Sequence, residues 1–166
     1  AVAGGADYLE AGTPLIKSEG LDAVRQLRAL FPGHTIVADM KTMDAGRIEA
    51  EAAAKAGANV MTVCGTASES TIRECVEAGR HYGCQVAVDL LGVGDPAAFA
   101  ARAAELGVAW VDVHCPIDAQ MHGGDPLETL RRVRAATDRI VAVAGGINSE
   151  SAAAAVAAGA DVIIVG

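Results

Sequence analysis

The feature that most constrains this chain is a regular alternation of short apolar runs with segments of helical character. Several runs are introduced by one phrase, in which a glycine suited to a left-handed helix cap precedes a strand. A unit that recurs along a chain indicates a repeat architecture. The phrase occurs at Gly5-Ala6-Asp7, Gly57-Ala58-Asn59, Gly107-Val108-Ala109 and Gly159-Ala160-Asp161.

The apolar runs predict a parallel sheet. A run such as Asp161 to Val165 is almost entirely β-branched, which indicates a strand covered on both faces. Strands joined by helical crossovers must be parallel, and we expect six helices, including Ser18 to Phe31 and Leu127 to Ala136. The expected strands are Asp7 to Ala11, Thr35 to Met40, Asn59 to Cys64, Gln85 to Leu91, Trp110 to Cys115, Ile140 to Ala144 and Asp161 to Val165.

A doubly wound open sheet and a closed barrel are the two candidate architectures. The repeat is regular, and polar residues follow many strands instead of one switch point, which favours the barrel. Residues Ala1 to Gly5 resemble the end of a helix, so an eighth strand is expected upstream. The sequence therefore predicts an α/β fold, a single TIM (β/α)8 barrel domain over residues 1–166 that lacks its first strand.

Composition excludes several partners. The net charge is −8 without a basic run, which argues against nucleic acid and anionic membranes. No apolar stretch reaches the roughly 18 residues of a membrane span, and no leader opens the chain, so a cytoplasmic protein is expected. The four cysteines, which lack a CxxC pair, are expected to be reduced packing residues: Cys64, Cys75, Cys84 and Cys115.

Charged residues at neighbouring strand ends point to a cation site. Asp39 and Lys41 are two apart and share a face of one strand, and Glu10 ends the strand before it. A structural ion pair is the alternative interpretation, since buried charges occur paired. Carboxylates suit Mg²⁺, which is usually held by one or two of them. We expect Glu10 and Asp39 to be magnesium ligands.

Glycines at the last two predicted strand ends indicate a phosphate site. Gly145 and Gly146 follow one strand and precede Asn148-Ser149, a predicted helix N-cap, so main-chain N–H groups could face an anion there. Gly166 ends the next strand. Barrels of this type hold phosphate at these ends, although a glycine pair also serves simple turns.

Three further features have open interpretations. His114 ends its strand and is a candidate proton carrier, while Asp112 on the same face either orients that imidazole or bonds a neighbouring backbone. Asp44 either acts in the site or caps the next helix. The glycine-rich segment from Pro116 to Gly124 is long enough for a mobile lid.

The chain resembles the orotidine 5′-phosphate decarboxylase suprafamily. The motifs that carry the resemblance are Glu10-Ala11-Gly12-Thr13-Pro14-Leu15, Asp39-Met40-Lys41-Thr42-Met43-Asp44 and Val143-Ala144-Gly145-Gly146-Ile147. The resemblance implies a ribulose-phosphate-binding barrel whose last helix is also absent here. It also implies a homodimer with shared active sites, in which Asp39, Lys41 and Asp44 form an acid, base and acid set and Asp44 reaches the partner's site.

Within the suprafamily, three positions separate an aldolase branch from a decarboxylase branch. The decarboxylases of 3-keto-L-gulonate 6-phosphate typically carry Glu, Arg and Thr where this chain has Asp89, Ile117 and Ala144. The resemblance therefore implies Mg²⁺-dependent condensation of formaldehyde with the sugar phosphate D-ribulose 5-phosphate, through an enediolate. The alternatives are the decarboxylase and, from another class, a noncatalytic barrel domain of a fusion protein.

Overall fold

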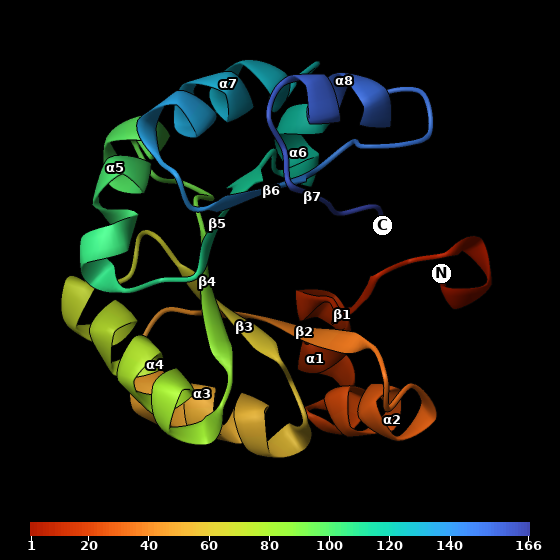
Figure 1. Ribbon diagram of the computed structural model, residues 1–166, viewed down its shortest axis with the longest axis vertical. Helices are drawn as coiled ribbons and strands as arrows, with labels where there is room; N and C mark the ends of the chain where they lie inside the picture. The colour runs from red at the N-terminus through yellow and green to blue at the C-terminus, as the bar shows by residue number, and fades with distance from the viewer. The chain divides into compact units, whose positions relative to one another are not determined.

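The computed structural model describes residues 1–166 and contains one seven-stranded sheet with the strands in chain order, β1 to β7 (Figure 1). The pairs β1–β2, β2–β3, β5–β6 and β6–β7 all run parallel, which confirms the predicted parallel α/β sheet. The strands are β1 (Tyr8–Ala11), β2 (Thr35–Thr42), β3 (Val60–Cys64), β4 (Gln85–Asp89), β5 (Trp110–His114), β6 (Ile140–Ala144) and β7 (Val162–Ile163).

The helices occupy the six crossovers between these strands, but two crossovers hold two helices each, so the expectation of six helices was wrong. The predicted helix from Ser18 to Phe31 contains one helix (Asp22–Leu30) and only the last two residues of another (Thr13–Glu19), with Gly20, whose φ is 67°, between them. A short 3-10 helix precedes β1 (Val2–Gly4). The helices are α1 (Thr13–Glu19), α2 (Asp22–Leu30), α3 (Gly46–Ala56), α4 (Glu69–Tyr82), α5 (Pro96–Leu106), α6 (Ile117–Gln120), α7 (Leu127–Ala136) and α8 (Ala152–Ala157).

Half of the strand ends agree with the prediction and the other half differ by one or two residues, and β7 is shortened most. It covers only Val162–Ile163. Gly166 was expected to end this strand, but it lies three residues beyond it. β2 runs on to Thr42 because the strand continues past an irregularity after Ala38. The glycines of the repeated phrase adopt left-handed φ values as predicted, at Gly5, Gly57, Gly107 and Gly159.

The chain divides into two compact units. Unit 1 comprises Ala1–Val63 and Ala67–Ala87, and unit 2 comprises Cys64–Thr66 and Val88–Gly166. The core of unit 1 is built around Ile36, Met61 and Ile72, and that of unit 2 around aliphatic residues of β5, β6 and α7. Trp110 on β5, 5% exposed, is the one aromatic residue among the buried hydrophobic side chains, in keeping with the low aromatic content of 3%.

Small residues let two helices of unit 1 approach closely. Ala50, Ala53 and Ala56 on α3 are buried. A Cβ on Gly46 would lie 2.3 Å from the main-chain oxygen of Thr71 in α4. Because that contact is closer than real Cβ atoms allow, the start of α3 requires glycine. None of the helices is both long enough and apolar enough to cross a membrane.

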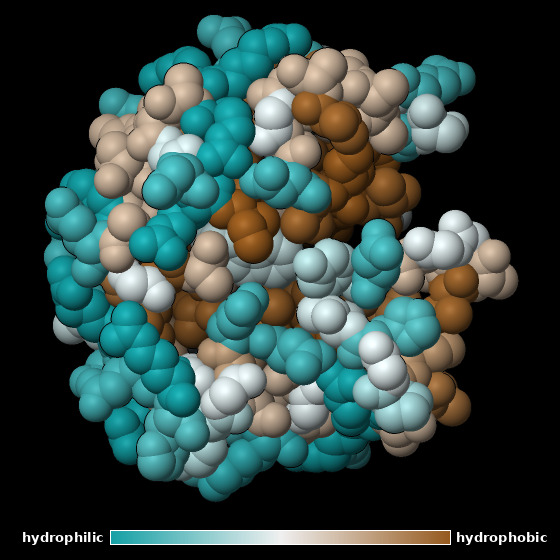
Figure 2. Space-filling model, in the orientation of Figure 1, coloured by the Kyte–Doolittle hydropathy of each residue, from teal (hydrophilic) through white to brown (hydrophobic).

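Unit 2 carries apolar surface around its last elements. Val156 on α8 is 58% exposed and Val165 after β7 is 66% exposed, and Figure 2 shows brown, apolar atoms gathered near the positions of α8 and β7. β7 is the last strand in the sheet order. Apolar surface of this kind is typical of a region that packs against another element.

Candidate active site

In unit 1, the carboxylate of Asp39 on β2 is held by donors at both of its oxygens. Oδ1 accepts from Lys41 Nζ at 3.0 Å and from Thr62 Oγ1 at 2.8 Å. Oδ2 lies 2.6 Å from Thr13 Oγ1 and 3.3 Å from Thr13 N. Asp39 is only 8% exposed. A buried carboxylate is costly unless its oxygens are paired and hydrogen-bonded, and these contacts meet that requirement.

Lys41 contacts Asp39 as predicted, but through an irregular backbone. Its φ is 46°, which is uncommon for a residue other than glycine. The β2–β3 register shifts between Ala38 and Thr42, so Lys41 lies within a bulge. The contact therefore does not arise from the alternation of side chains between the two faces of a regular strand. The bulge brings the Lys41 ammonium group to the Asp39 carboxylate.

Glu10 on β1 fits the expected metal pair in register. It pairs with Val37, and Asp39 lies two residues further along β2. With parallel strands about 4.8 Å apart and a rise of about 3.3 Å per residue, the two Cα atoms are separated by roughly 8 Å. Glu10 is exposed, so its carboxylate can turn. A cation between the two carboxylates is compatible with this spacing, provided that one donor to Asp39 gives way.

Asp44 does not cap α3 in the usual way. The N-cap position is Ala45, with left-handed φ and ψ of 54° and 37°. The Asp44 carboxylate accepts from the adjacent Ala45 N at 2.7 Å, whereas an N-cap side chain accepts from an amide two or three residues ahead. Asp44 is exposed. The capping interpretation is thus not supported, and the exposed carboxylate is available to other groups.

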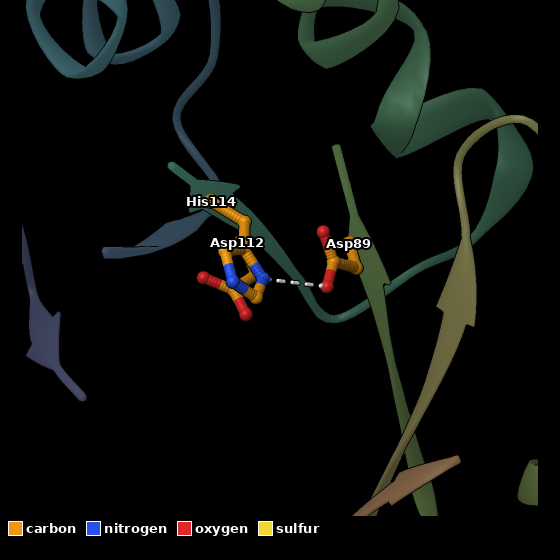
Figure 3. Close-up of side chains that lie close together, drawn as sticks. All are labelled: Asp89, Asp112 and His114. Atoms are coloured by element: carbon orange, nitrogen blue, oxygen red, sulfur yellow. Dashed lines mark hydrogen bonds and ion pairs between the residues drawn. The ribbon is translucent and has the colours of Figure 1, made fainter. Parts of the chain in front are cut away.

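In unit 2, β4 and β5 bring Asp89 and His114 together (Figure 3). His114 Nδ1 lies 3.0 Å from Asp89 Oδ2, and Asp89 Oδ1 accepts from Leu91 N at 2.8 Å. Asp89 is completely buried, while the His114 side chain is 22% exposed. A carboxylate on Nδ1 favours the proton on that nitrogen and fixes the orientation of the ring.

Asp112 is the third member of this cluster. Ligand atoms of Asp89, Asp112 and His114 lie within 4.8 Å of one another, a spacing at which three such groups could hold a metal ion. Asp112 is 6% exposed and projects beside the imidazole in Figure 3. The contact with Nδ1 comes from Asp89, a partner of the imidazole that the sequence did not suggest.

The glycine turn after β6 requires glycine for reasons of space. Gly145 and Gly146 have φ values of 94° and 76°. A Cβ on Gly145 would lie 2.1 Å from the main-chain oxygen of Cys115. The regular part of α8 begins at Ala152, later than expected. Asn148 nevertheless acts as an N-cap residue does: its Oδ1 accepts from Glu150 N and Ser151 N, two and three residues ahead, and Ala152 N donates to Asn148 O at 2.9 Å.

The segment predicted as a lid contains structure of its own. Ile117 begins α6 and is 71% exposed. Gln120 Nε2 donates to Cys115 O at 2.8 Å and ties the helix to the end of β5. Ala144, the last residue of β6, is buried and pairs with His114. Ala144 thus lies next to His114 in the sheet, whereas Ile117 is open to solvent.

The cysteines are free and buried, as expected. Burial and the nearby Asp125 carboxylate raise the pKa of the Cys115 thiol above its usual value. Burial raises the pKa values of Cys75 and Cys84 to about 12. A thiol is a weak nucleophile until it loses its proton, so these residues have no place in the chemistry.

Sequence reasoning missed Thr13 and Thr62. Both hydroxyls contact Asp39, from residues 26 and 23 positions away in the chain. Thr13 opens α1, and Thr62 lies in the middle of β3. Threonine is common in strands because it is β-branched, so its presence in the sequence does not indicate a site. Its hydrogen-bond partner is known only once the pairing of the strands is known.

Comparison with known proteins decides the family. Residues 1–166 match the sequence model of the orotidine 5′-phosphate decarboxylase / HUMPS family. The chain belongs to this family. A 3-hexulose-6-phosphate synthase from Methylomonas aminofaciens is 42% identical over 161 residues, which cover 96% of this chain and 77% of the relative. The family resemblance, and the expectation that the chain is an enzyme, are therefore confirmed.

Solved structures of the family confirm the barrel-type fold. A crystal structure of a 3-hexulose-6-phosphate synthase superposes with a TM-score of 0.92 and 40% identity, over 99% of this chain and 80% of that one. A crystal structure of KGPDC from Streptococcus mutans, solved as a ligand complex, superposes with a TM-score of 0.90 and 27% identity. That match covers 99% of this chain and 78% of the other. Proteins with both names thus share the fold.

Proposed function

We propose that this chain is an aldolase that reversibly condenses formaldehyde with D-ribulose 5-phosphate to give 3-hexulose 6-phosphate. The observation that carries the proposal is the ion pair between the buried Asp39 and the partly buried Lys41, in a chain 42% identical to a synthase of that name. Burying two charges is costly unless the pair is well hydrogen-bonded. A function that uses the pair accounts for its retention at a strand end.

The proposed reaction begins with loss of a proton from C1 of the ketose phosphate. The electrons of that C–H bond form the enediolate, whose C1 then bonds to the carbon of formaldehyde. The carbonyl electrons of formaldehyde move to its oxygen, which takes a proton and becomes the new hydroxyl. The ammonium group of Lys41, fixed by Asp39, stabilises the negative charge that develops on the ketose oxygen.

Glu10 and Asp39 are the proposed Mg²⁺ ligands, on the basis of their spacing on β1 and β2. When bound, the cation supplies Lewis-acid stabilisation of oxygen charge. The chain's own contribution is to hold the Asp39 carboxylate in one orientation, through Thr13, Thr62 and Lys41. This support of a ligand by neighbouring donors is typical of metal sites.

In unit 2, His114 is the proposed proton carrier. Its Nδ1 is fixed by the buried Asp89, which orients an imidazole that is proposed to exchange a proton with the reacting oxygen or carbon. Gly145, Gly146 and Gly166 are proposed to bind the phosphate through main-chain N–H groups. Binding energy from a remote phosphate then helps to orient the reacting carbon.

Asp44 and the remaining specificity positions complete the proposal. The exposed carboxylate of Asp44 is proposed to act in the site of a second copy, in a homodimer with shared active sites. The decarboxylases typically carry Arg and Thr where this chain has Ile117 and Ala144, whose side chains have no hydrogen-bond donor. The proposed site therefore lacks donors for a carboxylate-derived group and has space for a small aldehyde.

The decarboxylase is the second candidate, because a KGPDC structure superposes with a TM-score of 0.90. In that reaction the enediolate forms by loss of CO₂ instead of a proton. Asp89, Ile117 and Ala144 all fall on the aldolase side of the family pattern. Assaying the protein with ribulose 5-phosphate plus formaldehyde, and separately with 3-keto-L-gulonate 6-phosphate, distinguishes the two.

The experiment that tests the proposal follows formaldehyde consumption as a function of ribulose 5-phosphate and Mg²⁺. Turnover that needs both compounds is expected, and Asp39→Asn should reduce kcat by about a hundredfold or more. The matched control is Asp22→Asn, which removes a surface carboxylate paired with Arg25 and should leave kcat unchanged. A folded, dimeric protein without turnover would refute the aldolase and direct attention to the decarboxylase assay.

A further inference from the structure

The bulge in β2 places three residues opposite a single residue of β3. Ala38 pairs with Met61 and Thr42 pairs with Val63, so Asp39, Met40 and Lys41 all lie across from Thr62. Bulges beside active sites commonly redirect side chains. Here the bulge coincides with the left-handed φ of 46° at Lys41. Such strain persists only where surrounding contacts impose it.

Thr62 supplies those contacts through one hydroxyl group. Its Oγ1 accepts from the main-chain N–H of Lys41 at 2.9 Å and donates to Asp39 Oδ1 at 2.8 Å. A hydroxyl has a single proton, so accepting from the amide leaves that proton for the carboxylate. Asp39 Oδ1 also accepts from Lys41 Nζ at 3.0 Å, which closes a ring through the three residues.

Thr62 differs in this respect from the other threonine on Asp39. Thr13 contacts the Oδ2 atom and the main-chain oxygen of Asp39, whereas Thr62 contacts both Asp39 and the backbone of Lys41. In a regular parallel ladder the Lys41 amide would donate to a main-chain oxygen of β3. The threonine side chain takes that role inside the bulge, and it is only 3% exposed.

We propose that Thr62 is a positioning residue for the aldol reaction. It holds Lys41 in its left-handed conformation and turns the Asp39 carboxylate toward the Lys41 ammonium group. Thr62 itself touches no substrate. The inference rests on the proposed function in one respect, because it assigns the ordered Asp39–Lys41 pair to the reaction; the ring of hydrogen bonds stands without it.

Two substitutions separate this role from simple packing. Thr62→Val keeps the shape of the side chain and removes the hydroxyl, while Thr62→Ser keeps the hydroxyl and removes a methyl group. With Thr62→Val, kcat for formaldehyde consumption should fall by about tenfold to a hundredfold, and KM should change less. With Thr62→Ser, kcat should stay within about threefold of the parent. Equal losses in both variants, or full activity in Thr62→Val, would overturn the proposal.

A crystal structure of each variant gives a readout that does not depend on activity. In Thr62→Val, Lys41 should leave its left-handed φ and the Nζ–Oδ1 contact should lengthen beyond hydrogen-bond distance; Thr62→Ser should preserve both features. An unchanged Lys41 in Thr62→Val overturns the positioning role even if the parent protein is inactive. Absence of turnover in the parent, with the structural changes present, refutes only the aldolase and leaves the role of Thr62 in ordering the pair.

Discussion

Each of the two units contains an arginine that fastens a helix to the start of a strand, and the two arrangements correspond closely. In unit 1, Arg28 on α2 contacts Gly57 and Asn59 in the loop before β3. Asn59 Oδ1 also accepts from Ile36 N in β2, at 2.9 Å. A Cβ on Gly57, which has a φ of 105°, would lie 2.8 Å from Arg28 Cγ.

Unit 2 repeats the central part of this arrangement, which we call the arginine clamp. Arg134 on α7 binds Asp161 Oδ2 at 2.9 Å, in the loop before β7. The same Oδ2 accepts from Val141 N in β6 at 2.9 Å. Gly159 has a φ of 101°, and a Cβ there would lie 2.5 Å from Arg134 Cγ. In both units the arginine lies in the last turn of its helix, and its acceptor stands two residues after the crowded glycine.

The two clamps differ in charge and in the number of acceptors. Arg28 donates to four neutral acceptors, on Gly57, Pro32, His34 and Asn59. Arg134 donates to the carboxylate of Asp161 and to Thr137 O. An amide and a carboxylate thus fill the same position. What the two clamps share is the position of one side-chain oxygen, Asn59 Oδ1 or Asp161 Oδ2, which accepts from the arginine and from the preceding strand. The charge of that oxygen differs between them and is not a shared requirement.

The largest test of the comparison is alanine at the two glycines. Gly57→Ala and Gly159→Ala should each lower the free energy of unfolding by about 2 to 3 kcal/mol, because a left-handed φ and a close contact with the arginine stem act together. Urea denaturation measures the effect. Gly83→Ala, with a φ of 73° and open space, isolates the backbone strain and should cost about 1 kcal/mol. A cost at either clamp no greater than at Gly83 would break the equivalence.

Removal of the arginines tests the difference in acceptors. Arg28→Ala should cost about 2 kcal/mol of unfolding free energy, and Arg134→Ala about 1 kcal/mol, since fewer hydrogen bonds are lost. Thermal and urea unfolding of both variants provides the comparison. Arg25→Ala removes only a surface pair with Asp22 and should cost under about 0.5 kcal/mol. Equal costs at Arg28 and Arg134 would show that the number of acceptors does not matter.

Exchange of the two acceptors has the smallest expected effect. Asp161→Asn should cost less than about 1 kcal/mol, because the Arg134–Asp161 pair is partly exposed. Asn59→Asp should gain a similar amount. Both changes should shrink as NaCl rises from about 0.02 to about 1 M, since salt screens partly exposed charges. Unfolding at the two salt concentrations checks this. A change in unfolding free energy that is the same at both concentrations, for either variant, would contradict the electrostatic account.

The sequence predicted the parts of the fold that depend on local patterns. The glycine phrases marked four left-handed turns, and the strands were placed to within about two residues. It could not reveal the arginine clamps, because Arg28 lies 29 residues before its partner Gly57. It also joined the end of α1 to α2, since a helix break at Gly20 depends on a backbone angle that no periodicity encodes.

The candidate site divides along the same line. The spacing of Asp39 and Lys41 led us to expect them side by side, and the strand ends together with the family resemblance suggested the other site residues. The bulge that brings Asp39 and Lys41 together and the hydroxyl of Thr62 could not be predicted, because both depend on pairing between strands, with Thr62 standing 23 residues after Asp39. One of two interpretations gave His114 a partner in Asp112 on its own strand, and the contact between its Nδ1 and Asp89 on β4 was not foreseen.

The crowding at Gly145 affects how an alignment of relatives should be interpreted. Any side chain there would collide with the rigid main chain at Cys115 O, whether or not a phosphate ever binds. Selection would therefore keep glycine at position 145 even in a relative that had lost its substrate. Gly146 is less constrained by space, because a Cβ there would meet only the Gln120 side chain, at 3.2 Å, but its φ of 76° favours glycine as well. Invariance at either position therefore reports first on the backbone of the turn and only then on ligand binding.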